Sequence, residues 1–201
     1  QGQMLPIAAG PHDTHAQALD VIIASLRMAF PQLWLRAVGH RVVHGGVHYA
    51  QPLVLDEDIL ETLATLEPFA PLHQPHNLCG IRAAMAAFPG VPQVACFDTA
   101  FHRQHPWVND TFALPRALYD EGVRRYGFHG LSYAYVADEL AHTAPTLAAG
   151  NVVVAHLGNG ASLCATRGGR SMATSMGFSA LDGLVMGTRS GSIDAGVLLH
   201  L

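Results

Sequence analysis

The apolar run VPQVACFD, residues 91–98, constrains the fold more than any other stretch of the sequence. An apolar run that is bounded by proline and ends at a polar residue, here Asp98, is typical of a buried strand. Helical patterns surround it: apolar residues recur at helical spacing after Asp13 and after Asp56, and again over 78–88. A buried strand among amphipathic helices predicts an α/β fold.

The sequence pattern changes after a fourth expected helix, residues 131–140. Residues 151–166 read NVVVAHL, GNG and ASLCAT, which predicts a hairpin with two β-rich arms around a glycine turn. Helices and strands alternate before this hairpin, whereas strands cluster after it. We therefore expect two domains, 1–148 and 149–201, and a final helix capped by Asp194.

Composition excludes several classes of partner. The 201 residues carry a net charge of −4, with no run of like charges, so we expect neither nucleic acid nor an anionic membrane surface as a partner. All 11 basic residues are arginine, so any anion site must use guanidinium groups, histidine or backbone N–H groups. No apolar run reaches the roughly 18 residues of a membrane span, and no signal peptide is recognisable, which predicts a cytoplasmic location.

Glycines flank the arginines and histidines of most interest. The clusters are Arg41 before GG, His129 between two glycines, and Arg189 within GTRSG. Glycine lets the backbone approach a ligand closely and direct N–H groups at an anion, and Asp98 would lie at the sheet edge where α/β proteins bind ligands. Each motif alone is more often a turn or a cap. Their joint occurrence predicts several loops that converge on a phosphate.

The 13 histidines raise the possibility of a metal site. His40, His44 and His48 are spaced by four residues, but that spacing suits zinc only on a helix. The stretch that carries them predicts a strand and a glycine turn. We therefore expect no histidine metal site here.

Six motifs taken together closely resemble the acetate kinase family. They are GHRVVHGG (39–46), APLHQP (70–75), FDTAFH (97–102), YGFHGLSY (126–133), HLGNGAS (156–162) and MGTRSG (186–191). The resemblance implies a two-domain α/β protein of the actin-like, ribonuclease H-like ATPase fold, usually a homodimer. It also implies reversible phosphoryl transfer from ATP to acetate, giving acetyl phosphate and ADP, with Mg²⁺ as the cofactor of ATP.

The resemblance further implies roles for individual residues. The catalytic residues would be Asp98, His129 and Arg189, with His129 donating a neutral N–H to the phosphoryl oxygens. The substrate would be bound by Arg41, Val43, Leu72, His73 and Phe128. The phosphates of ATP would be bound by His156, Leu157, Gly158, Asn159 and Gly160. Because a carboxylic acid is already ionised at neutral pH, we expect Asp98 to orient groups, or to assist magnesium through water, rather than to act as a base.

The chain departs from the family pattern in two respects. The family's first strand and its later magnesium-binding glutamate are not found, so we expect an internal fragment, truncated at both ends and inactive by itself, whose metal ligands lie outside this chain. Ala180 stands where the family commonly has proline, which would enlarge the acyl pocket. A propionate or other short-chain acyl kinase is therefore one alternative. A noncatalytic nucleotide-binding module, as actin-like relatives are, is another.

Overall fold

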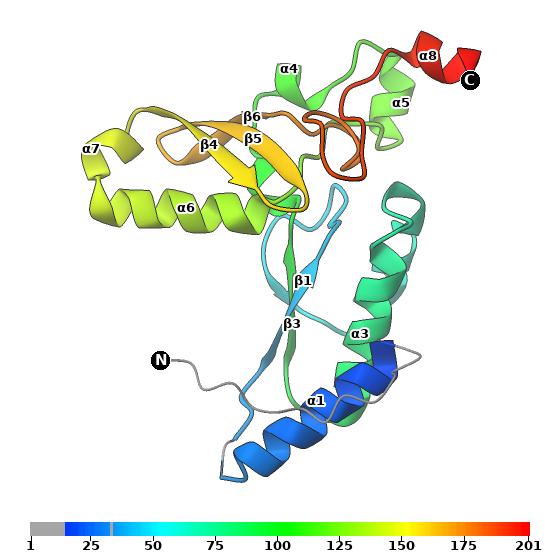
Figure 1. The fold of residues 1–201 in the computed structure, drawn as a ribbon, viewed down its shortest axis with the longest axis vertical. Helices are drawn as coiled ribbons and strands as arrows, with labels where there is room; N and C mark the ends of the chain where they lie inside the picture. Colours follow the sequence, from blue (N-terminus) through cyan, green and yellow to red (C-terminus); the bar gives the residue numbers. More distant parts are fainter. Residues whose placement is uncertain (1–14, 33) are drawn as a thin grey trace.

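The computed structural model describes residues 15–32 and 34–201, which form an α/β structure with two separate sheets (Figure 1). The elements are α1 His15–Ala29, β1 Val38–Val42, β2 Leu53–Val54, α2 Glu57–Ala64, η1 Glu67–Phe69, α3 Gln74–Ala87, β3 Gln93–Phe97, η2 Ala100–His102, α4 Trp107–Asp110, α5 Arg116–Asp120, α6 Gly130–Thr143, α7 Pro145–Ala148, β4 Asn151–Leu157, β5 Ala161–Arg167, β6 Arg170–Thr174 and α8 Ala195–His200. No helix within these ranges is long and apolar enough to cross a membrane.

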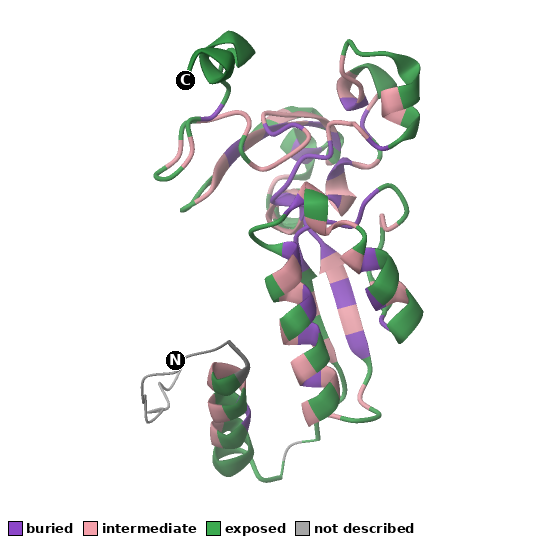
Figure 2. Cartoon of the chain, turned by 90° about the vertical axis from the view of Figure 1, so that its right-hand side faces the viewer, coloured by how far each residue is buried: buried purple, intermediate pink, exposed green. Residues whose placement is uncertain are grey.

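The first sheet has the strand order β1-β3-β2, with β1 parallel to β3. The predicted strand is confirmed: β3 ends at Phe97, and the Asp98 N–H donates to the carbonyl of Val42 at 3.0 Å. Residues of the sheet and of helices α2 and α3 pack together in one buried cluster, which includes Leu60, Leu63 and Phe97. Figure 2 shows the buried positions of this part of the chain in purple. Burial of each such side chain stabilises the fold by about 1.5–3 kcal/mol. Because β1 and β3 are parallel, their carboxyl ends lie at the same edge of the sheet.

The predicted helices form, with shifted boundaries. Asp56 caps α2 as expected, and its carboxylate accepts from the Ile59 N–H at 2.8 Å. Helix α3 begins at Gln74, four residues before the predicted start. Pro75 is tolerated there because the first-turn N–H groups of a helix have no intrahelical partner. Asp13, expected to cap α1, lies outside the described residues.

The second sheet has the order β4-β5-β6 and is antiparallel. The predicted hairpin is confirmed, with Leu157 opposite Ala161 across the GNG turn. Strand β6, which follows β5 through the glycine pair 168–169, was not predicted from the sequence. Helix α6 packs against both β3 and β4 and connects the two sheets, so the ends of β1, β3 and β4 face a common region (Figure 1).

A buried ion cluster anchors the loop that precedes α6. Arg103 donates to the carbonyls of Arg125 and Tyr126, at 2.8 and 3.0 Å, and pairs with Asp110 at 3.2 Å. Asp110 Oδ1, which pairs with Arg103, also lies 2.9 Å from His105 Nε2. Asp110 Oδ2 accepts from the Tyr119 hydroxyl at 2.9 Å. Buried polar groups that are hydrogen-bonded in this way hold a loop in one geometry.

Two fully buried histidines, His44 and His102, form hydrogen bonds to backbone groups of neighbouring loops. His102 Nε2 donates to the carbonyl of Phe128 at 3.0 Å, and His44 Nδ1 accepts from the Gly46 N–H at 2.9 Å. These partners fix both neutral rings with the hydrogen on Nε2. Burial disfavours the charged imidazolium and lowers the pKa of each ring from 6.5 to about 4.

We expect acid to destabilise the fold well before the carboxylates titrate. Because the pKa of His44 and His102 is lower in the folded chain than in the unfolded one, their stabilisation is complete above pH 6.5 and is lost as the pH falls towards 4. At pH 5 each histidine should lower the free energy of unfolding by about 2 kcal/mol relative to pH 7.

Urea unfolding at pH 7 and pH 5 measures this difference. His102→Gln should reduce the pH dependence, whereas His142→Gln, at an exposed position on α6, should leave it unchanged. Equal free energies of unfolding at the two pH values would contradict the assignment.

Candidate active site

Residues from both sheets line one cavity of about 470 Å³ at the junction described above. It is lined by Arg41, Val43, His73, Asp98, Phe128, His129, Leu131, Ser132, His156, Asn159, Gly160, Ala180 and Arg189. An adjoining cavity of about 440 Å³ shares Val43, His73, Phe128, Asn159, Ala180 and Arg189 with it. The structure therefore brings together most of the residues predicted from separate motifs.

Arg41 and Asp98 form a bidentate ion pair at the edge of the first sheet. Arg41 Nε lies 3.0 and 3.2 Å from the two carboxylate oxygens, and Nη2 lies 2.6 Å from Oδ2. The Asp98 side chain is 2% exposed, whereas that of Arg41 is 66% exposed. The hydrogen bond to Asp98 raises the pKa of Arg41. The buried carboxylate thus holds a solvent-facing guanidinium in a fixed orientation.

His129 occupies the position just before α6. Its backbone is left-handed (φ 60°), and it is the only non-glycine residue with positive φ in the described ranges. Its ring stacks on His156, with 4.1 Å between ring centroids. Burial, reinforced by His156, Arg41 and Arg189, lowers the pKa of His129 to about 4, so the ring is neutral at pH 7. A strained backbone of this kind clusters at functional sites.

The glycines on either side of His129 fit the loop against protein, not against the cavity. A Cβ on Gly130 would lie 2.3 Å from the Asp98 carbonyl oxygen, which accepts from the Gly130 N–H. A Cβ on Gly127 would lie 2.6 Å from the His102 ring. Close packing against protein atoms is therefore already a sufficient reason for glycine at both positions.

Gly160, in the GNG turn, does leave space in the cavity. A Cβ there would lie 2.9 Å from His129 Nε2 and 3.6 Å from Arg189 Nη1, so both groups border the volume that a side chain would fill. The Arg189 side chain is oriented by a 2.9 Å hydrogen bond from Nη1 to the carbonyl of Ala180. A neutral N–H and a guanidinium beside the same space suit an anionic oxygen.

Most of the remaining predicted residues lie around this space, although Gly158 lines neither cavity. Val43 and Phe128 pack in an apolar cluster beside Ala180, and Leu72 lines the adjoining cavity with 73% exposure. His73 lines both cavities. Leu157 is 74% exposed and lines neither of them. An anion-binding region thus adjoins an apolar pocket.

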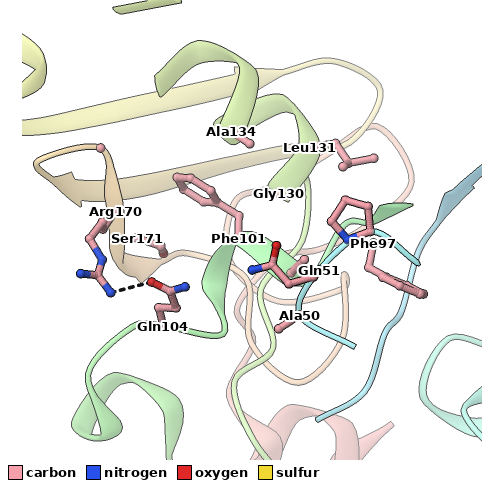
Figure 3. A pocket seen from close by; sticks show the side chains of 13 residues that line it. Ala50, Gln51, Phe97, Phe101, Gln104, Gly130, Leu131, Ala134, Arg170 and Ser171 are labelled. Atoms are coloured by element: carbon pink, nitrogen blue, oxygen red, sulfur yellow. Dashed lines mark hydrogen bonds between the residues drawn. The ribbon is translucent and has the colours of Figure 1, made fainter. Parts of the chain in front are cut away.

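A further cavity of about 320 Å³ contains none of the predicted site residues (Figure 3). Apolar residues such as Phe97, Phe101 and Ala134 line most of it, and an Arg170–Gln104 hydrogen bond of 2.6 Å lies at one end (Figure 3). It offers neither the paired donors nor the carboxylate of the larger cavity.

Sequence reasoning missed three hydroxyl groups behind the two stacked rings. Ser162 Oγ lies 2.8 Å from His129 Nδ1, and Ser132 Oγ lies 3.0 Å from His156 Nδ1. The Tyr133 hydroxyl contacts Ser162 Oγ. Helical spacing could have identified Tyr133, which is four residues beyond His129 and so on the same face. The contact to Ser162 depends on the tertiary fold.

The described residues include no cluster of side chains that could hold a metal ion by itself. No group of three or more His, Cys, Asp or Glu side chains within 15–32 and 34–201 could hold a metal ion. Asp98 is the one carboxylate that lines the 470 Å³ cavity, and Arg41 engages both of its oxygens. Mg²⁺ favours oxygen ligands, commonly carboxylates, phosphates and water.

Solved structures of similar chains identify the class of fold. The chain matches a propionate kinase from Francisella tularensis with a TM-score of 0.88 and 41% identity, over 93% of this chain and 49% of that one. It matches an acetate kinase from Entamoeba histolytica with a TM-score of 0.83 and 37% identity, over 95% and 48%. The chain therefore has the actin-like ATPase fold.

The chain belongs to the acetokinase family, whose model matches residues 2–201. It is 63% identical over 187 residues to an acetate kinase from Methylocella silvestris, covering 93% of this chain and 46% of that protein. It is 52% identical over 189 residues to an acetate kinase from Rhodopseudomonas palustris, covering 94% and 48%. The chain spans about half the length of the curated relatives it matches.

Gly160→Ala should obstruct the space between His129 and Arg189. Its backbone φ is not in the left-handed region, so alanine strains no dihedral, but the methyl group would lie within 2.9 Å of His129 Nε2. We expect the dissociation constant for inorganic phosphate to rise at least tenfold, about 1.4 kcal/mol. An NMR titration of this chain with phosphate measures it.

Gly158→Ala in the same turn is the matched comparison, because its methyl group would meet only atoms at 3.5 Å. It should weaken phosphate binding less than Gly160→Ala does. Equal effects of the two substitutions would contradict a specific role for the Gly160 space.

Proposed function

We propose that this chain carries the acyl-phosphate site of an acetate kinase, which transfers a phosphoryl group reversibly from ATP to acetate. The observation that supports this most strongly is the convergence of Arg41, Arg189 and neutral His129 beside an apolar pocket. Phosphoryl transfer requires reactants in line and stabilisation of charge that spreads over the phosphoryl oxygens. Acetate adds the need for a pocket that accepts one methyl group.

Arg41 binds the substrate carboxylate and the phosphoryl group in this proposal. Asp98 engages Nε and Nη2, and among the described residues no hydrogen bond engages Nη1. Nη1 is therefore the group through which the guanidinium contacts the ligand. Asp98 acts as a positioning carboxylate rather than as a base, because acetate arrives without its acidic proton at neutral pH.

His129 and Arg189 stabilise the transferring phosphoryl group. Both border the space beside Gly160, so one oxygen placed there would meet a neutral N–H and a guanidinium together. The apolar pocket formed by Val43, Phe128 and Ala180 receives the methyl group of acetate. Residues 156–160, which comprise the end of β4 and the turn to β5, bind the phosphates of ATP.

Two further features of the proposal, Mg²⁺ as the companion of ATP and a homodimer, rest on family membership rather than on a contact within this chain. Two others, a cytoplasmic location and the division of the chain into domains at residue 148, rest on the sequence pattern. When bound, Mg²⁺ would neutralise charge on the phosphates.

A propionate kinase is the second candidate. Ala180 is small, and it borders both cavities, so the acyl pocket could admit another methylene group. One methylene changes discrimination by only about 1–3 kcal/mol. Comparing kcat/KM for acetate and propionate decides between the two substrates; a preference for propionate would overturn the proposal for acetate. A noncatalytic nucleotide-binding module would form no acyl phosphate from either acid.

Arg189→Ala should lower the rate of acetyl phosphate formation by about a thousandfold, or roughly 4 kcal/mol, because an arginine directed at the transferring phosphoryl group supplies at least that much. The assay uses a full-length chimera in which residues 15–201 replace the matching segment of the Methylocella silvestris relative. Acetyl phosphate is trapped as its hydroxamate.

Arg116→Ala is the control, since Arg116 lies on α5, is exposed and pairs with Asp120 one turn away. It should leave the rate unchanged. Full activity of Arg189→Ala would contradict the role given to Arg189, and an inactive parent chimera would contradict the proposed function.

A further inference from the structure

Two buried hydroxyl groups stand between the His129 ring and the protein interior. Ser162 on β5 is fully buried, and its Oγ lies 2.8 Å from His129 Nδ1. Tyr133, one turn along α6 from His129, is also fully buried, and its hydroxyl contacts the same Oγ. Neither residue lines the cavity. Any effect they have on a ligand therefore passes through the His129 ring.

Hydrogen-bond accounting gives this chain of groups a direction. Burial raises the pKa of Tyr133 to about 12, so its hydroxyl keeps its hydrogen. Among the described residues Ser162 Oγ is the acceptor within reach of that hydrogen. The remaining partner for the hydrogen of Ser162 is His129 Nδ1, which then accepts it. The opposite direction would leave a buried phenol hydrogen without an acceptor, and a Ser162 Oγ that accepted from both neighbours would leave its own hydrogen without a partner among the described residues. Folded proteins rarely tolerate either arrangement.

The direction of these hydrogen bonds decides which ring nitrogen of His129 carries the hydrogen. When Nδ1 accepts, the hydrogen of the neutral ring is on Nε2. Nε2 is the atom 2.9 Å from the position of a Cβ on Gly160, beside Arg189. In the other tautomer Nε2 would present a lone pair to an anionic oxygen in that space and would repel it.

We propose that Tyr133 and Ser162 are positioning residues that hold His129 in the tautomer with hydrogen on Nε2, so that the ring can donate to an anionic oxygen beside Gly160. The identity of that oxygen, a phosphoryl oxygen, rests on the proposed function. The tautomer itself does not. The relay runs from the Tyr133 hydroxyl through Ser162 Oγ to His129 Nδ1.

The neighbouring ring provides an internal comparison. His156 stacks on His129 but takes its contact at Nδ1 from a different serine, Ser132, at 3.0 Å. His44 and His102 supply reference signals, because backbone partners already fix their hydrogens on Nε2. Three histidines of the chain therefore serve to calibrate or control the measurement on His129.

The test is a long-range ¹H–¹⁵N correlation spectrum of the imidazole groups in the uniformly ¹⁵N-labelled chain at pH 7. The tautomer of each neutral ring determines the shift of its two nitrogens. The His129 signals are assigned by their loss in His129→Asn, since asparagine tolerates the left-handed backbone. We expect wild-type His129 to show the same pattern as His44 and His102.

Removal of one hydroxyl should redistribute the hydrogen. In Tyr133→Phe, Ser162 is free to accept from Nδ1, so at least a tenfold rise in the Nδ1–H population of His129 is expected. Ser162→Ala should also change the His129 signals. Tyr135→Phe, an exposed tyrosine on the same helix, should change none, and Ser132→Ala should change His156 more than His129.

Three results would overturn the relay: wild-type His129 with its hydrogen on Nδ1, an unchanged tautomer in both relay variants, or a Tyr135→Phe effect equal to that of Tyr133→Phe. The first of these is read from the wild-type chain alone, whatever the stability of the variants.

The active chimera provides a kinetic test of the same relay. Tyr133→Phe should lower kcat more than it raises KM, and no change in kcat would also contradict the relay. An inactive chimera with the expected tautomer would contradict the proposed function and leave the relay intact.

Discussion

The contacts of Asp98 organise the rest of the site. Its N–H bonds to the end of β1 through Val42, its carbonyl accepts from Gly130 at the start of α6, and its carboxylate holds Arg41. One residue therefore sets the relative positions of two strands, a helix start and a guanidinium. Such a junction requires a residue without a side chain at position 130, because a Cβ there would collide with the Asp98 carbonyl. The packing of the loop and the chemistry of the cavity have a common origin.

Around this junction, charge and burial both lower the pKa of His129. Arg41 and Arg189 keep the cavity positive, while burial and these two neighbours keep His129 uncharged. A neutral N–H can donate without adding a third positive charge that would have to be desolvated. The sheet that carries Ser162 supplies the hydroxyl behind the ring, so both sheets contribute to one donor. The fold thus prearranges donors before a ligand arrives, as electrostatic preorganisation requires.

Local patterns predicted β3, α6 and the β4–β5 hairpin, because each has a signal in its own sequence: an apolar run, a helical spacing of apolar residues, and two β-rich arms around a glycine turn. They also placed Asp98 at a strand end and His129 at a helix start. They did not reveal how closely the glycines beside His129 are packed, since the Asp98 carbonyl and the His102 ring that crowd them come from another part of the chain. For the same reason they missed Ser162, whose partner is 33 residues away. The short strand β6 lacks an apolar run long enough to identify it.

The most direct test of the organising role of Asp98 is a double-mutant cycle on kcat/KM in the full-length chimera, with Arg41→Gln, Asp98→Asn and the double variant. Both substitutions keep the approximate size of the side chain. If the carboxylate acts by orienting the guanidinium, the two losses overlap, and the double variant should lose at least tenfold less than the product of the single losses, about 1.4 kcal/mol of coupling. Losses that multiply independently would show that Asp98 and Arg41 act separately.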